Sequence, residues 1–417
     1  MIGCASSPVA DLPSNTLGLR ENLSQFLLLT AANCFVGGVV GAQRSVLPMV
    51  GGEYFGLASA TALTSFVVSF GIVKACTNLV AGRLADRIGR RNVLLLGWAA
   101  AAPIPFMIAV AADRHAWWMI VAANVLLGIN QGLCWTMTVV MKVDLVGARR
   151  RGLALGVNES AGYTFVALAA FLVALMATEA MPLRGIIILT GVFVGAGFCL
   201  SLIFVRDTEA HLEMERARDE SAPRPARVPR ARLAASQAGL LCNLNDAVIW
   251  TTLPPFLAAL RLDAAHVGFF AALYPGIWGL SQLVTGALSD RFGRTRLIII
   301  GMFVQGAGHI VLGFAGYSPM IAAAGGCTLL GIGTALAYPS LLAFVADQSL
   351  PMDRSKALGS YRFFRDMGYA AGALGAGAMV DAAGFAAAIH VSGAVTILSG
   401  VVFMTLIRPG AVSPGGR

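Results

Sequence analysis

The sequence predicts an all-α membrane protein whose twelve transmembrane helices form two pseudo-symmetric six-helix bundles. Three observations predict it: a very apolar composition, apolar segments of membrane-spanning length, and an internal repeat of the two halves. The 417 residues are 57% hydrophobic and 12% charged, with a mean hydropathy of +0.75, whereas a soluble domain carries about 25% charged residues. This composition excludes an ordinary cytosolic enzyme, a disordered chain and a nucleic-acid binder, and makes the lipid bilayer the main partner.

Twelve apolar segments are bounded by charged residues or by Pro and Gly, and a helical span needs about 20 such residues. In the first half we expect helices at residues 25–47, 57–81, 93–112, 116–141, 153–177 and 185–205. In the second half we expect helices at residues 236–260, 266–288, 297–315, 319–346, 357–380 and 385–407.

A long hydrophilic segment at residues 206–235 separates the halves. It begins RDTEAHLEMERARDESAPRPARVPRAR, and these charges and prolines do not remain in hydrocarbon. We therefore expect a solvent-exposed linker between one bundle at residues 24–205 and another at 236–407, with tails at 1–23 and 408–417. The seven cysteines are scattered, so we expect neither a disulfide framework nor a metal site.

Basic residues concentrate in the loops on one side of the predicted membrane. Three lie in the opposite loops, namely Arg114, Arg184 and Arg261. Thirteen lie on the first side, namely Arg83, Arg87, Arg90, Arg91, Lys142, Arg149, Arg150, Arg151, Arg291, Arg294, Arg296, Arg354 and Lys356. Because cytoplasmic loops carry the excess of Lys and Arg, we expect a protein of the cytoplasmic membrane with the linker and both termini in the cytoplasm.

The two halves share landmarks at a nearly constant offset. The segment GRLADRIGRR from Gly82 recurs as GALSDRFGR from Gly286, a displacement of 204 residues. Leu47-Pro48 recurs as Leu253-Pro254, and Asp144 is matched by Asp347. The sequence therefore predicts homologous bundles in parallel orientation, an arrangement known in transporters with a site at the membrane midplane.

With two copies of the G-x3-D-R-x-G-R pattern in corresponding loops, the chain from about residue 24 to 407 resembles the major facilitator superfamily, most closely in general type its bacterial efflux members. The resemblance implies that these loops latch the cytoplasmic side while the transporter faces outward, and that Asp144 pairs with a loop arginine. The alternative is that these charges only reflect the general excess of Lys and Arg in cytoplasmic loops. The gating residues so implied are Gly82, Asp86, Arg87, Gly89, Arg90, Arg91 and Asp144, then Gly286, Asp290, Arg291, Gly293, Arg294 and Asp347.

Ionisable residues inside spans carry more information about function, because each costs several kcal/mol unless it is paired or wetted. At a rise of about 1.5 Å per residue, Lys74, Glu159 and Asp246 lie roughly 12–15 Å from their helix ends. Arg44 lies nearer the outer surface, where we expect its side chain to snorkel to water. The candidate substrate or proton residues are Asp246, Asn243, Asn245, Glu159, Asn158, Lys74, Arg362, Arg365 and Asp366.

These groups face a cavity or each other. In the superfamily that the chain resembles, the second span packs near the eleventh, so a Lys74–Asp366 pair or a Lys74–Arg365–Asp366 cluster is expected. Asp246 and Glu159 are the best candidates for proton coupling, since a coupling carboxylate changes its proton affinity between two exposures. A purely structural inter-helix pair is the alternative for each, and the balance of three acids with three bases leaves the substrate's charge open.

The resulting hypothesis is a monomeric secondary active transporter that moves a small solute across the cytoplasmic membrane by alternating access, with proton-coupled export as the expected mode. Proton-coupled uptake of a small organic anion or metabolite is the alternative, and a non-transporting sensor or a membrane enzyme is the alternative of another class. We expect no cofactor and no enzymatic activity, because no nucleophile–base pair or metal cluster is visible.

Two departures from the resembled family weaken a standard drug/proton antiporter. Many proton-linked members carry R-x-x-Q-G in the fourth span, where this chain has Asn124-Val-Leu-Leu-Gly128. Efflux members usually carry a Gly-Pro pair in the fifth span, where this chain has Gly156 to Tyr163 without proline.

Overall fold

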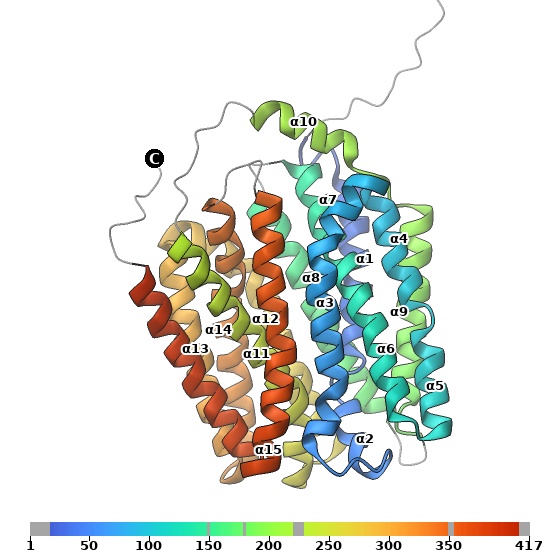
Figure 1. Cartoon of the computed structure of the whole chain (residues 1–417), viewed down its shortest axis with the longest axis vertical. Helices are drawn as coiled ribbons and strands as arrows, with labels where there is room; N and C mark the ends of the chain where they lie inside the picture. The colour runs from blue at the N-terminus through green and yellow to red at the C-terminus, as the bar shows by residue number, and fades with distance from the viewer. Residues whose placement is uncertain (1–16, 148–150, 178–180, 220–228, 349–353, 408–417) are drawn as a thin grey trace, which may run out of the picture.

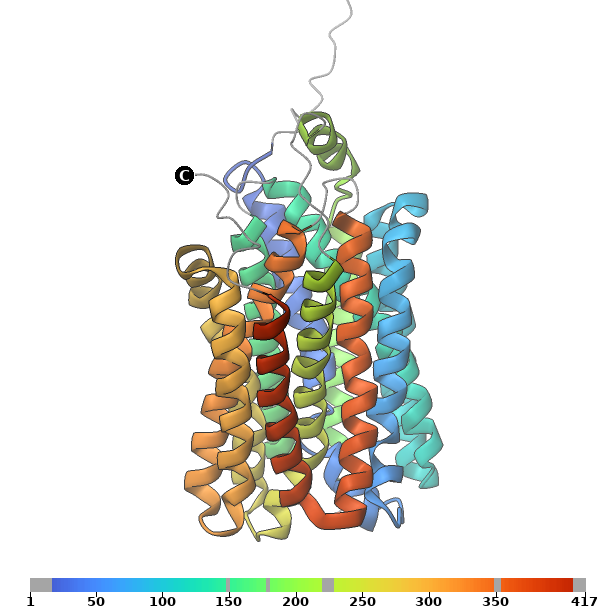
Figure 2. The same cartoon turned by 60° about the vertical axis from the view of Figure 1, so that its left-hand side comes forward.

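The structure of the protein is a computed structural model that describes residues 17–147, 151–177, 181–219, 229–348 and 354–407. The two halves form bundles that lie side by side (Figures 1 and 2). The tail at 408–417, most of the tail at 1–23, Arg149 and Arg150 lie outside the described residues, as do the side chains of Arg151, Asp290, Arg354 and Lys356.

The first half provides six spans, two of them built from more than one helical segment. The single-helix spans are α1 (Leu23–Gly41), α3 (Ala60–Ile88), α8 (Arg151–Met176) and α9 (Arg184–Ile203). The third span consists of α4 (Arg90–Ala101) and α5 (Ile104–Arg114), and the fourth of α6 (Trp117–Asn130), a π-helical turn (Gln131–Trp135) and α7 (Thr136–Val146).

The second half also provides six spans. Its helices are α11 (Pro229–Ala259), α12 (Ala264–Phe292), α13 (Arg294–Gly313) and α14 (Pro319–Asp347), with a 3-10 turn at Phe314–Gly316. The last element, α15 (Arg354–Leu406), supplies both the eleventh and twelfth spans, because Gly384 with φ 84° reverses the chain inside it. The expected twelve-span, two-bundle architecture is confirmed.

Length and composition identify ten spanning helices in the described chain. The last of them, Ala357–Leu406, is long enough to cross twice. Helix α11 is not among the ten, because Asn243, Asn245 and Asp246 lie in its middle. Large apolar side chains cover the outer surface as a lipid-facing coat: Phe106 is 74% exposed and Ile321 is 76% exposed.

Several expected boundaries are wrong in detail. The first span ends at Gly41, and a turn leads to a separate short helix, α2 (Leu47–Glu53), because Pro48 suits the first turn of a new helix. The linker is partly helical and partly buried: α10 spans Glu209–Asp219, and α11 already begins at Pro229, with Ala234 and Ala235 fully buried. Lys142, expected in a basic loop, is fully buried because α7 continues to Val146.

The bundles meet along two pairs of helices, α3 with α15 and α8 with α12. Glycine permits the close approach: a Cβ added at Gly71 of α3 would stand 2.6 Å from the backbone nitrogen of Ala370 in α15. A Cβ added at Gly279 of α12 would stand 2.8 Å from the backbone nitrogen of Thr164 in α8. Small residues allow helix backbones to approach in membranes, and Figure 1 shows α3 beside α15.

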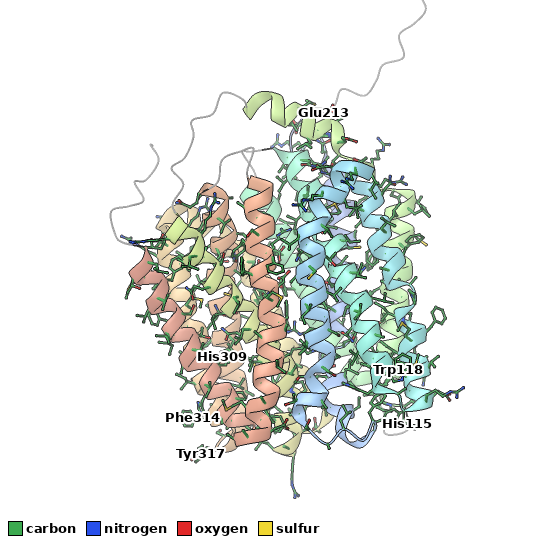
Figure 3. All side chains as sticks on the ribbon, viewed as in Figure 1. His115, Trp118, Glu213, His309, Phe314 and Tyr317 are labelled. Carbon is green, nitrogen blue, oxygen red and sulfur yellow. The ribbon has the colours of Figure 1, made fainter. Side chains whose placement is uncertain are left out.

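The molecule has two distinct ends. We call the end that carries α10 the linker end and the opposite one the far end. Figure 3 shows Glu213 at the linker end, and His115, Phe314 and Tyr317 at the far end. Tyr317 is 90% exposed and Trp118 is 68% exposed, as is usual for aromatic residues at a membrane–water interface.

Candidate solute and proton site

Arg44 and Asp246 form an ion pair between the two bundles. Arg44 follows α1 in the first half and Asp246 lies in α11, and their side chains are 4% and 0% exposed. Nη1 of Arg44 lies 3.4 Å from Oδ2, and the Tyr369 hydroxyl donates to Oδ2 at 2.8 Å. The expectation that Arg44 snorkels is wrong, because the turn after Gly41 directs it to α11 and over the Trp250 ring at 5.0 Å.

Asp366 in α15 is surrounded by donors from three helices. Arg365 donates to both carboxylate oxygens, at 2.7 and 3.0 Å, and Asn243 of α11 donates at 2.6 Å. Asn78 of α3 also donates to Asp366 across the bundle interface. The carboxylate therefore has a full set of partners, and the expected Arg365–Asp366 contact is present.

Lys74 does not join that cluster as an ion pair. Its side chain is 7% exposed, and no carboxylate oxygen of the described residues lies within 4.0 Å of its amine. Instead the amine lies over the rings of Phe70 at 5.3 Å, Trp135 at 5.8 Å and Tyr369 at 4.9 Å. The expected direct Lys74–Asp366 pair is absent because Asn78, one helical turn further along α3, occupies the position beside Asp366.

Glu159 and Arg362 flank the π-helical turn from opposite bundles. Trp135 Nε1 donates to Oε1 of Glu159 at 2.8 Å, and the Asn158 amide lies 3.4 Å away. Arg362 donates to the hydroxyl of Thr136 at 3.3 Å. Within the described part of the chain, Oε2 of Glu159 and Nε of Arg362 are buried without a hydrogen-bond partner. Because Trp135 and Thr136 are adjacent, Lys74, Glu159 and Arg362 gather around one turn.

Asn245 lies apart from this interface. Its side chain accepts from Ser392 at 3.0 Å and Thr396 at 2.8 Å, and donates to Gln305 at 3.2 Å, all inside the second bundle. On α11, Asp246 faces Arg44 of the first bundle and Asn243 faces Asp366 of α15, while Asn245 points into the second bundle. The expectation that Asn245 lines the shared site is therefore wrong.

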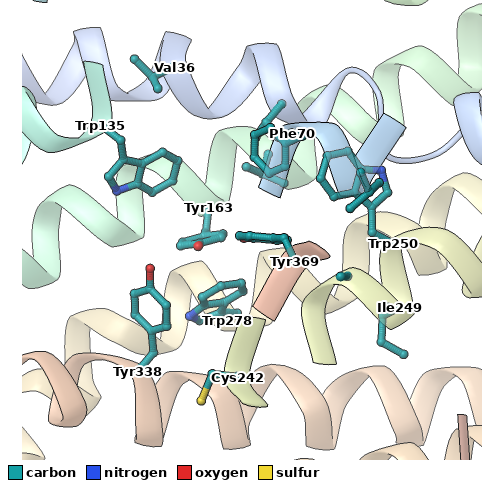
Figure 4. Packing of buried hydrophobic residues seen from close by; sticks show 14 of the residues in the cluster. Val36, Phe70, Trp135, Tyr163, Cys242, Ile249, Trp250, Trp278, Tyr338 and Tyr369 are labelled. Atoms are coloured by element: carbon teal, nitrogen blue, oxygen red, sulfur yellow. The ribbon is translucent and has the colours of Figure 1, made fainter. Parts of the chain in front are cut away.

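Aromatic rings from both bundles gather in the interior of the molecule (Figure 4). Tyr163 of α8 stacks on Trp278 of α12 with ring centroids 3.5 Å apart, and Tyr338 of α14 lies 5.2 Å from Trp278. Trp135 lies 5.1 Å from Tyr163. Reasoning from the sequence concentrated on charges and missed Tyr163, Trp278 and Tyr369; aromatic residues in the middle of polar spans were the available signal.

A small hollow beside this layer, about 10 Å³ in volume, is lined by Arg44, Trp250 and Tyr274 among others.

The two signature loops differ in burial. In the first copy Arg90 Nε lies 2.6 Å from Asp144, both largely buried, and Thr208 of the linker donates to Asp144 at 2.8 Å. The linker also reaches this loop through Asp207, which accepts from the Arg91 backbone nitrogen at 2.9 Å. In the second copy Arg294 and Asp347 pair at the surface, with side chains 27% and 53% exposed.

The remaining loop residues form the turns. Gly89 has φ 83° and Gly293 has φ 89°, a region that favours glycine, and each joins two consecutive helices. Asp86 is exposed and has no ion pair with the described residues. Arg87 and Arg291 lie in the last turns of α3 and α12, and Gly82 and Gly286 meet no described atom within 4 Å of an added Cβ.

The far end of the interface is closed by Asp381 of α15. Its carboxylate accepts from the backbone nitrogens of Ala60 at 2.7 Å and Thr61 at 3.0 Å, and from the Thr61 hydroxyl at 2.6 Å. These groups begin α3, so a side chain of the second bundle caps a helix of the first. Nearby, a Cβ added at Gly377 would stand 2.7 Å from Thr61 Cα.

Comparison with known proteins decides the family. The sequence profile of the Major Facilitator Superfamily matches residues 29–239 and 235–417. This chain belongs to the major facilitator superfamily. It is therefore a membrane transporter.

Relatives in the superfamily are distant. An MFS-type transporter of Salmonella typhimurium is 24% identical over 354 residues, 81% of this chain and 85% of that protein. Multidrug resistance protein 2 of Bacillus subtilis is 25% identical, and the match covers 40% of each chain. The Bacillibactin exporter of the same species is 28% identical over 28% of this chain and 29% of its own length.

Two solved structures have the same fold. The human organic anion transporter MFSD10 superimposes with a TM-score of 0.71 at 16% identity, covering 92% of this chain and 99% of that one. The nucleoside transporter NupG superimposes with a TM-score of 0.71 at 12% identity, covering 92% of this chain and 100% of that one.

Proposed function

We propose that this chain exports small organic solutes across the cytoplasmic membrane in exchange for protons, by alternating access and as a monomer. Two relatives carry export or multidrug resistance in their names, which supports the outward direction. One chain supplies both bundles and all the groups around Trp135, so one protomer suffices. The proposal includes no chemical step on the solute, and hence no enzymatic role.

The linker end is proposed to face the cytoplasm. The exposed Arg83 and Arg87 and the half-buried Arg91 lie at that end, whereas Arg114 and Arg261 lie at the far end. The positive-inside rule then places the linker, and with it both termini, on the cytoplasmic side. In that orientation the Asp381 contact closes the outer side.

The observation that carries proton coupling is the Arg44–Asp246 pair. Within the described residues it is the one ion pair that joins the two bundles, so separation of the bundles at the far end must break it. A buried carboxylate without a cation holds a proton, and one paired with arginine releases it. Asp246 would therefore take a proton while the outer side is open and release it when the pair re-forms, which carries the proton inward.

The signature loops are proposed to act when the far end opens. Asp86 lies at the end of α3 and has no ion pair with the residues that the structure describes, which suits a latch that is not engaged while the far end is closed. The Arg90–Asp144 and Arg294–Asp347 pairs would hold each loop in shape within its own bundle. Their proposed role is conformational and does not select the solute.

Uptake of an organic anion together with protons is the second candidate. Lys74 and Arg362 lack an ion-pair partner among the described residues, and this favours an anion. The negative charge of a bound anion would stabilise a proton on nearby Glu159. An anion and a proton that bind together travel together, and an inward proton gradient would then drive uptake.

Transport by everted membrane vesicles with an acidified lumen separates the two candidates. The lumen corresponds to the outside of the cell, so exchange concentrates labelled solute in the lumen while protons leave. We expect this for at least one member of a panel of labelled organic anions and cations, and we expect Asp246→Asn to abolish it. Preloaded solute that leaves the lumen on acidification would establish cotransport and overturn the export proposal.

A further inference from the structure

We infer that the transported solute is an organic anion with a flat, unsaturated body, whose negative group binds between Lys74 and Arg362. The inference rests on the proposed transport function and names the solute class for the same site.

Charge at the bundle interface is unbalanced once the ion pairs are assigned. Asp246 is paired with Arg44 and Asp366 with Arg365. Among the described charged residues at this interface, those outside the two ion pairs are Lys74, Arg362 and Glu159, which are two cations and one acid. A buried cation without a partner is costly, so the site gains most from a solute that brings one negative charge.

The two cations lie on opposite bundles and meet at the same turn. Lys74 of α3 lies over the ring of Trp135, and Arg362 of α15 donates to the hydroxyl of Thr136. Both side chains are more than nine-tenths buried, and Nε of Arg362 has no hydrogen-bond partner among the described residues. A carboxylate placed between them would accept charge-assisted hydrogen bonds from both, which are stronger than those between neutral groups.

The surroundings favour a flat body next to that carboxylate. Tyr163 and Trp278 are stacked across the bundle interface, and Trp278 Nε1 is buried without a hydrogen-bond partner among the described residues. Because the two rings belong to opposite bundles, their stack separates when the bundles move apart at the linker end. A planar solute can then stack on either ring and accept a hydrogen bond from Trp278 Nε1.

Matched probe pairs test the inference on the purified full-length protein. Each pair has one planar body and differs in charge: 1-naphthoate with 1-naphthamide, and 2-naphthoate with 2-naphthamide. Binding is measured by tryptophan fluorescence and by the rise in the unfolding midpoint, which reports binding to the native state. We expect at least one acid to bind ten times more tightly than its amide, and 1-naphthylmethylammonium not to bind.

Variants locate the binding. Lys74→Gln and Arg362→Gln should each weaken binding of the acid at least tenfold without affecting the amide, and Lys74→Arg should restore it. Lys142→Gln is the matched control, because Lys142 is a fully buried lysine of the first bundle whose amine lies over the ring of Phe26. It should leave the affinity unchanged.

Three outcomes overturn the inference: no acid binds more tightly than its amide, the ammonium probe binds instead, or Lys74→Gln and Arg362→Gln keep the affinity of the acid. These failures are distinct from failure of the transport proposal. Asp246-dependent exchange of a cation in vesicles would leave export standing and remove the anion. Binding of the acids without transport in vesicles would leave the anion site standing and overturn the export proposal.

Discussion

The two ends of the bundle interface are held in different ways. At the far end Asp381 of one bundle caps the first turn of α3 in the other, and Gly377 lies against Thr61. At the linker end Asp86 has no ion pair with the described residues, and a Cβ added at Gly82 or Gly286 would meet no described atom within 4 Å. The interface is thus fastened at the far end, whereas Asp86 at the linker end has no such partner among the described residues.

This difference indicates how the two ends exchange roles. Fastening at the far end uses a carboxylate at a helix N-terminus, where backbone N–H groups favour negative charge. In the signature loop the carboxylate lies at the opposite end of the same helix, because Asp86 is in the last turn of α3. Between the two ends lies the Arg44–Asp246 pair, and our proposal is that it breaks when the far end opens. Four experiments break or sharpen this comparison.

The largest effect is expected from Arg44→Ala. It leaves Asp246 buried without its cation, and removal of one partner of a buried pair costs about 3–5 kcal/mol. The free energy of unfolding in detergent should fall by that order. The double variant Arg44→Met/Asp246→Leu should regain most of the stability yet remain inactive in proton exchange. If the double variant instead loses as much stability as Arg44→Met and Asp246→Leu lose when summed, the two residues do not act as a pair.

The two signature loops provide the next contrast. Arg90→Gln breaks a largely buried pair, and Arg294→Gln breaks one at the surface. Surface pairs contribute about 0–1 kcal/mol and buried ones several times more. Thermal unfolding should therefore shift clearly for Arg90→Gln and little for Arg294→Gln. Equal shifts would show that burial and the contact with the linker do not distinguish the copies.

A smaller effect is expected from Asp381→Ala, which removes the cap on α3. We expect a membrane-impermeant maleimide to label a cysteine placed at Ala271, in the hollow near Arg44, at least three times faster. Asp263→Ala is the control, since Asp263 caps α12 of its own bundle, accepting from the His266 backbone nitrogen at 2.8 Å. If both variants label at the same rate, the Asp381 contact does not close the far end.

The sequence predicted the spans, the repeat and most of the buried charged residues, because charge inside hydrocarbon is costly wherever it occurs. Lys74, Glu159, Asp246, Arg362, Arg365 and Asp366 are all buried. The partners of these residues were harder to predict. Arg44 was placed wrongly because the turn after Gly41 carries no hydropathy signal. Asn245 was placed wrongly because adjacent positions on a helix face different sides. The Asp381 cap joins residues 320 apart along the chain, which no local pattern encodes.

The most direct test of the account measures the far-end distance between the bundles. Spin labels at Arg114 and Arg261, one in each half, would report it in a cysteine-free variant reconstituted in lipid. At pH 8 we expect one short population, because Asp246 is paired with Arg44 and the far end is closed. Acidification to pH 5, or Asp246→Asn, should add a population several Å longer. Distances that respond to neither change would contradict the claim that the Arg44–Asp246 pair controls opening of the far end.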